Sequence, residues 1–169
     1  HGGQGSINAV RSGTSAGALG QAYGTSYTSP TSIGSGGGAG YDCAGGAGGG
    51  AISLNISGTI NNEGIISANG SGPNCYASGG GGSGGSLHIQ TDTVSGSGSI
   101  EANGGTPLGT YQGGGGGGGF VSVIYATTNS VTPRAYGGGV LTSSLDIVGA
   151  AGTAYLKNST TGEETLIVD

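Results

Sequence analysis

The chain has 169 residues, a length that suits one compact domain or one short stack of repeats. Gly supplies 45 residues, only 7% of residues are charged, and the formal net charge is -5. The three cations, Arg11, Arg134 and Lys157, lie far apart in the sequence, so the clustered basic surface of a nucleic-acid-binding protein is not expected. No apolar run reaches the ~18 residues of a membrane-spanning helix.

Residues 1–34 form a polar arm rich in Gly, Ser and Thr. The chain starts at His1 without an initiator Met or a signal-peptide pattern, and we expect it to derive from a larger precursor. Such an arm buries too little apolar surface to offset its ordering entropy by itself. It should therefore be either mobile or laid against another part of the molecule.

Residues 51–70 and 86–104 are copies of one unit, offset by 34 or 35 residues. Each copy follows a glycine run, and a third glycine run precedes residues 120–125. The alignment places Leu54 over Ile89, Ile60 over Val94, Ile66 over Ile100, and Ala68, Asn69 and Gly70 over Ala102, Asn103 and Gly104. A fixed period of this size is typical of stacked repeats. We divide the chain into the arm, three repeats (35–70, 71–105 and 106–139) and a C-terminal strand segment (140–169).

The glycine runs recur in register with the strands, unlike ordinary linkers. Glycine allows backbones to approach as closely as they do in polyproline-type bundles. We therefore favour packed, extended arms similar to polyproline II, with flexible loops as the alternative.

Apolar and polar residues alternate in the repeats, which is the pattern of strands with one buried face. In the second repeat Leu87, Ile89 and Thr91 should point inward, and His88, Gln90 and Asp92 outward. The predicted fold is all-β, a parallel β-solenoid-like stack of about three repeats. Residues 120–125 are apolar on both faces, as in a strand that is covered on two sides. Further strands are expected at 144–148, 153–156 and 165–168.

Two features favour an extracellular location. Cys43 and Cys75 each precede a glycine run at nearly matching places, so stacking predicts a disulfide between them. Two free thiols are the alternative. Asn55, Asn69 and Asn158 begin N-x-Ser/Thr sequons and are candidate glycosylation sites, with Asn55 the best placed because strand parity turns it outward.

Motifs for catalysis, cofactors and metals are weak, and we predict none of the three. Residues 81–85 match G-x-S-x-G, but no helix follows to lift Ser83 clear of a sheet. A copper site would need His1 to meet His88, which strand parity does not suggest. Asp42 starts a calcium-binding nonapeptide that has no second copy. The carboxylates of Asp92 and Glu101 are not paired by the sequence. These two acids, like Glu63 and Asp146, are expected on turns or outer faces.

The order of motifs supports a resemblance. GSGGG, GGAGGGAI, two G-x-I-x-A-N-G-like closures, GGSGGS and a seven-glycine run follow one another along nearly the whole chain. The chain thus resembles the glycine-rich repeat regions of large secreted or cell-surface proteins of algae, plants, other protists and bacteria. Its turn and strand cadence is also similar to that of filamentous-haemagglutinin-type β-helices. The resemblance implies a structural role at the cell surface or outside the cell, and no catalytic residues.

We therefore expect a structural extracellular protein that forms a fibre, a surface appendage or a wall layer. An adhesin or a glycan- or ice-binding module is the alternative, and a β-helical carbohydrate-active enzyme is a remote one. The expected partner is a second copy of the chain, with covalent glycans in addition. The residues expected to mediate self-assembly are apolar and lie in the third repeat and the last strand: Phe120, Ile124, Tyr125, Leu166, Ile167 and Val168.

Overall fold

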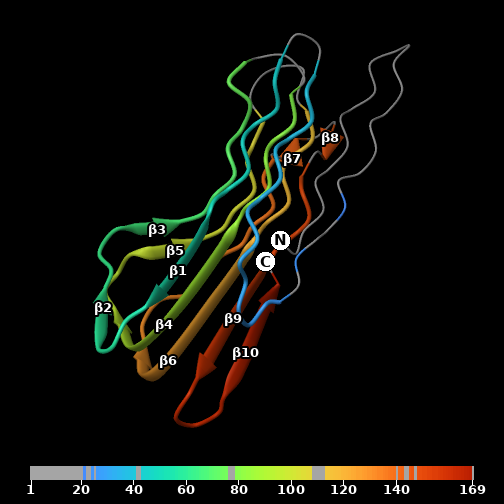
Figure 1. Cartoon of the computed structure of the whole chain (residues 1–169). Coiled ribbons are helices and arrows are strands. Elements are labelled where there is room, and N and C mark those ends of the chain that lie inside the picture. Colours follow the sequence, from blue (N-terminus) through green and yellow to red (C-terminus); the bar gives the residue numbers. More distant parts are fainter. Residues whose placement is uncertain are drawn as a thin grey trace.

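The computed structural model describes residues 21, 24, 26–40, 43–75, 79–107, 113–139, 141–142, 145–146 and 148–168. These residues form strands joined by extended segments and turns, without a helix (Figure 1). The strands are β1 (Ala51–Asn55), β2 (Thr59–Asn61), β3 (Ile65–Ser67), β4 (Ser86–Ser95), β5 (Ser99–Glu101), β6 (Phe120–Asn129), β7 (Leu141–Thr142), β8 (Leu145–Asp146), β9 (Thr153–Asn158) and β10 (Glu164–Val168). The predicted all-β class is confirmed.

The main sheet has the strand order β1-β4-β6-β9-β10, and β2 also pairs with β4. The first four strands of this order are parallel to one another. Strands β3 and β5 form a second parallel pair, and β7 and β8 form a short antiparallel pair. Figure 1 shows the five main strands side by side, with the glycine-rich segments running away from the starting ends of β1, β4, β6 and β9.

The pairing register agrees with the repeat alignment. Leu54 pairs with Ile89, Ile60 with Val94, and Ile66 with Ile100. We call a set of residues that pair with one another across successive strands a row. The rows continue beyond the second repeat, because Ser86 pairs with Phe120 and Phe120 with Thr153. Strand β9 thus adds a fourth member to the parallel row, within the segment that the sequence analysis set apart as C-terminal.

The last strand departs from a purely parallel stack. Strand β10 runs antiparallel to β9, so the main sheet is mixed. The cause is a tight turn: the Asn158 side-chain oxygen accepts hydrogen bonds from the amides of Thr160 and Thr161, and Gly162 has a φ of 76°. A connection this short can join only antiparallel neighbours.

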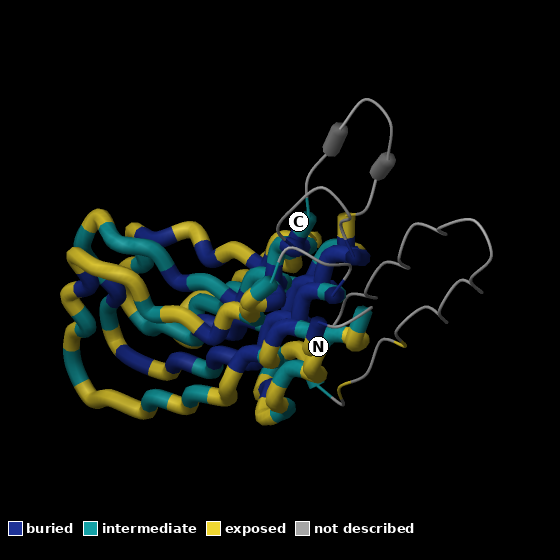
Figure 2. Tube along the Cα trace, turned by 90° about the horizontal axis from the view of Figure 1, so that it is seen from above, coloured by how far each residue is buried: buried dark blue, intermediate teal, exposed yellow. Residues whose placement is uncertain are grey.

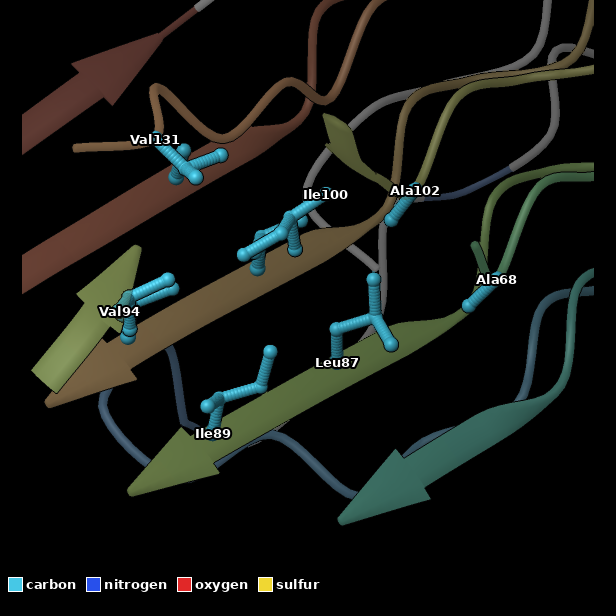
Figure 3. Close-up of a cluster of buried hydrophobic side chains, with 10 residues drawn as sticks. Ala68, Leu87, Ile89, Val94, Ile100, Ala102 and Val131 are labelled. Atoms are coloured by element: carbon cyan, nitrogen blue, oxygen red, sulfur yellow. The ribbon is translucent and has the colours of Figure 1, made fainter. Parts of the chain in front are cut away.

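The core lies on one side of the main sheet, which we call the core face. It is formed by Leu87 and Ile89 of β4, Val121 and Val123 of β6, and Ile100 of β5, all with no exposed surface. Figure 3 shows Leu87, Ile89, Val94 and Ile100 directed into one interior. The predicted inward positions of β4 are confirmed, since Thr91 is also buried. Alternation of side chains along each strand accounts for the pattern.

The glycine-rich segments are joined by backbone hydrogen bonds with a period of three residues. Within residues 79–85, positions 80 and 83 donate to segment 35–38, positions 81 and 84 to segment 114–117, and positions 82 and 85 to segment 68–71. Three residues per turn is the period of polyproline II, which leaves its own N–H groups free to bond neighbours. We call these packed segments, residues 34–40, 43–50, 70–75, 79–85, 104–107, 113–119, 137–139 and 148–152, the glycine bundle.

Close backbone approach explains the glycine content of the bundle. A Cβ atom built on Gly84 would lie 2.1 Å from the carbonyl oxygen of Ala102 and 2.6 Å from the amide nitrogen of Gly119. Residues 113–119 are all buried. Figure 2 shows the resulting block of buried residues in the middle of the molecule, with exposed residues along the outer loops. Here glycine is required by lack of space, as at the axis of a collagen helix.

Candidate functional site

The predicted disulfide is present. Cys43 is bonded to Cys75, with 6.0 Å between the two Cα atoms. The bond ties the start of residues 43–50 to the segment that precedes residues 79–85, so it links two successive layers of the glycine bundle. The alternative of two free thiols is therefore wrong.

The three sequon asparagines differ in how free their side chains are. Asn55 is exposed at the end of β1, as strand parity predicted. Asn69 is already engaged, because its side-chain oxygen accepts from the Asn103 amide at 2.7 Å and its nitrogen donates to Glu101 at 3.3 Å. Asn158 organises the β9–β10 turn with its side-chain oxygen. Among the three, Asn55 is exposed and its side chain makes no hydrogen bond to the described residues.

Polar side chains connect the layers along one corner of the molecule. Asn69 accepts from the backbone amide of Asn103, and Asn103 accepts from that of Tyr136 at 2.8 Å. The Glu101 carboxylate accepts from the side-chain amides of both asparagines. Each closing Ala-Asn-Gly turn thus holds the turn of the next layer, and Glu101 has a structural task.

The other side of the main sheet is covered by the chain itself. Residues 26–33, which we call the strap, cross the face opposite the core, which we call the strap face. The Ser122 hydroxyl donates to the Thr28 carbonyl at 2.7 Å, and the Ser86 hydroxyl donates to the Ser32 carbonyl at 2.6 Å. Tyr27 packs edge-on against Tyr155, with 5.5 Å between ring centroids.

The strap bears on two sequence-based expectations, the cover over the second face of β6 and the position of the polar arm. The predicted second cover over β6 exists, since Ser122 has no exposed surface. The described end of the polar arm is laid against the sheet, as one of the two alternatives for residues 1–34 proposed. The expected contact of Phe120 and Ile124 with a neighbouring copy stays a prediction, and both side chains are half-buried in the single chain. Sequence reasoning missed the role of Ser86 and Ser122; their position on the second face of buried strands was the available signal.

The six residues expected to mediate self-assembly fall into two groups. Phe120, Ile124, Tyr125 and Ile167 are half-buried within the molecule. Leu166 and Val168 of β10 are 55% and 68% exposed, and both lie on the strap face of that strand. Only these two present most of their apolar surface to the outside.

Both outermost strands of the main sheet, β1 and β10, lack a partner on their outer side among the described residues. Apolar side chains are also exposed close to β1 in the sequence: Ile56, which directly follows β1, is 38% exposed, and Ile65 of β3 is 71% exposed. Lys157 and Glu164 form an ion pair at 2.8 Å near the turn between β9 and β10. The Lys157 ammonium lowers the pKa of Glu164. Apart from Glu164, β10 carries no charged residue along its edge.

The residues that the sequence analysis considered for catalysis or metal binding have separate structural partners. Ser83 is buried in the glycine bundle and bonded to Ser35, Asp92 accepts from the Gly58 amide, and Glu63 accepts from Ser97. His88 lies half-buried on the strap face, where burial lowers its pKa. His1 and Asp42 lie outside the described residues, as does the side chain of Asp146. Within the described part of the chain, no group of three or more His, Cys, Asp and Glu side chains could hold a metal ion.

The described residues include no helix that could span a membrane. No protein-family model matches the chain, and no curated protein or solved structure shows significant similarity to it.

Proposed function

We propose that this chain is a structural extracellular protein that assembles with copies of itself into a fibre, a surface appendage or a wall layer. In this proposal the parallel row and the glycine bundle are the coils of a short β-solenoid, with bundle segments similar to polyproline II. The disulfide supports an oxidising compartment, because such bonds persist mainly outside the cytosol.

The observation that carries the proposal is the pair of outermost strands. The alternation that builds the interior continues to β1 and β10, and Glu164 is the one charged residue within these two strands. Natural sheets usually protect such edges with charges, Pro or bulges. Repeat proteins that stay monomeric usually carry polar capping units. An open sheet with Leu166, Val168, Ile56 and Ile65 exposed is instead suited to continued stacking.

Sedimentation and electron microscopy of the purified, disulfide-bonded chain test the proposal. We expect elongated particles whose length grows with concentration in the micromolar range, because each added copy exposes the same edge again. Variants with charges on the exposed apolar residues, Leu166→Lys with Val168→Glu, should remain monomeric and folded. A wild-type chain that stays monomeric throughout this range would contradict the proposal.

Glycosylation is a separate part of the proposal. We expect N-glycan on Asn55 of the native protein, because its side chain is exposed and makes no hydrogen bond among the described residues. Intact-mass measurement should then exceed the 15.7 kDa of the bare chain. The excess should disappear in an Asn55→Gln variant expressed in the native host and persist in Asn158→Gln. A bare mass for the native protein would remove the glycan from the proposal.

A further inference from the structure

Strands β1 and β10 have no partner on their outer sides among the residues that the structure describes, and they are complementary to each other. Both have five residues, Ala51–Asn55 and Glu164–Val168. Strand β1 runs parallel to β9, and β10 runs antiparallel to β9. A second copy in the same orientation, placed beside β10, would therefore bring its own β1 alongside as an antiparallel neighbour.

The outward backbone groups of β1 follow from its bonds to β4. Ser86 donates to the Gly50 carbonyl, and the Ile56 amide donates to the Gln90 carbonyl. Backbone groups alternate along a strand, so even-numbered residues of β1 face β4. The N–H and C=O groups of Ala51, Ser53 and Asn55 point to the open side.

The same reasoning applies to β10. The Asn158 amide donates to the Glu163 carbonyl, which makes this a hydrogen-bonded pair of the antiparallel ladder. Residues 163, 165 and 167 therefore face β9. The N–H and C=O groups of Glu164, Leu166 and Val168 point to the open side.

The side chains fit the same register. Ala51 and Val168 occupy one row of the sheet, since Ala51 pairs with Ser86, Ser86 with Phe120, Phe120 with Thr153, and Thr153 with Val168. Continuing the row into a second copy places Val168 opposite Ala51, Leu166 opposite Ser53, and Glu164 opposite Asn55. On the core face, Ile167 and Thr165 then meet Ile52 and Leu54, which are only half-buried in the single chain.

We propose that copies join head to tail by antiparallel pairing of β10 in one chain with β1 in the next, in the register Leu166 to Ser53. This inference rests on the proposed function and names its contact. Backbone parity, strand length and core-face chemistry agree on one register. A slip by one residue would turn Ile52 and Leu54 to the opposite face from Ile167. A slip by two would leave one end of each five-residue strand unpaired.

The register is tested by mixing two variants that each carry one added cysteine, Ser53→Cys and Leu166→Cys, with the Cys43–Cys75 disulfide intact, and treating them with a short bifunctional thiol crosslinker. Directly opposed residues in the hydrogen-bonded positions lie about 5.5 Å apart. We expect covalent dimers in the mixture and none with either variant alone. The matched control mixes Asn55→Cys with Val168→Cys, which the register separates by four residues, or about 14 Å. We expect its dimer yield to be at least tenfold lower.

A backbone variant tests the contact independently of cysteine chemistry. Leu166→Pro removes an N–H that points to the open side, so the bonds to β9 are kept. Leu166→Ala keeps that N–H and serves as the control. We expect Leu166→Pro to abolish assembly at concentrations where Leu166→Ala still assembles, with unchanged circular dichroism for both.

The outcomes separate the two proposals. Fibres of the wild-type chain with no preference for the Ser53 and Leu166 pair, or fibres of Leu166→Pro, would overturn this register and leave the proposed function standing. A wild-type chain that never assembles overturns both.

Discussion

The segments of the glycine bundle alternate along the chain with the paired strands, yet different forces hold the two regions. In the rows, apolar side chains such as Leu87 and Val121 are removed from water, and burial of apolar area is the main stabilising term. In the bundle, residues 113–119 are buried with hardly any side chain to bury. Their stability depends on satisfied backbone hydrogen bonds between close segments.

The two regions should therefore be destabilised by opposite kinds of substitution. A strand row tolerates exchange of one apolar side chain for another of similar volume, and it is damaged by removal of volume. The closely packed glycines of the bundle, such as Gly84, have no side-chain volume to lose, and addition of a single methyl group at these positions is destabilising. The disulfide lies in the bundle, where apolar burial contributes least.

The largest expected effect is therefore a glycine substitution in the bundle. Gly84→Ala should lower the free energy of unfolding by more than about 3 kcal/mol, because the added Cβ would overlap backbone atoms that cannot rotate away. The matched control is Gly50→Ala, where nothing lies within 4 Å of the added atom. Chemical denaturation should show the control to be neutral or slightly stabilised. Equal stability of the two variants would contradict the close packing of the bundle.

Removal of volume from the core is expected to come next. Leu87→Ala should cost about 3 kcal/mol through lost burial and the cavity left behind. Ile65→Ala, at a side chain that is 71% exposed, is the control and should change stability by less than about 0.5 kcal/mol in the isolated chain. If Leu87→Ala lowered the free energy of unfolding no more than Ile65→Ala, apolar burial would not be the main force that holds the strands.

A smaller effect is expected from the bonds that hold the strap. Ser86→Ala removes the donor to the Ser32 carbonyl and should cost about 1 kcal/mol. Hydrogen exchange should show faster opening of residues 26–33 with the core unchanged. Ser53→Ala removes an exposed hydroxyl from β1 and should leave exchange unaltered. Unchanged protection of the strap in Ser86→Ala would mean that its attachment lies elsewhere.

The smallest expected effect is the pH dependence from His88. Its Nδ1 atom is buried without a hydrogen-bond partner, and burial lowers its pKa from 6.5. The unfolded chain therefore binds a proton more readily than the folded chain, and stability should fall as pH decreases through 6.5 towards the lower, folded-state pKa. Above 6.5 this contribution is constant. In His88→Gln the decrease between pH 8 and pH 5 should be smaller; an identical pH profile would exclude His88 as its source.

The repeat register, the inward residues of β4 and the Cys43–Cys75 disulfide could all be predicted from the sequence. Alternation and a fixed period are local properties, and strands of equal pattern pair most favourably in register. It also indicated that the second face of β6 must be covered, because Phe120 and Ile124 are apolar where a solvated face would be polar.

In contrast, the segment that covers this face and the direction of the last strand of the main sheet became visible in the three-dimensional structure. The strap is mostly polar and has no periodic pattern, so the sequence does not indicate where it lies. Its attachment through the Ser86 and Ser122 hydroxyls follows from its position in the folded chain. The antiparallel return of β10 depends on a turn whose geometry the apolar pattern does not encode. The period-three contacts of the bundle are likewise invisible in runs of identical glycines, because the neighbours that require glycine come from three distant parts of the chain.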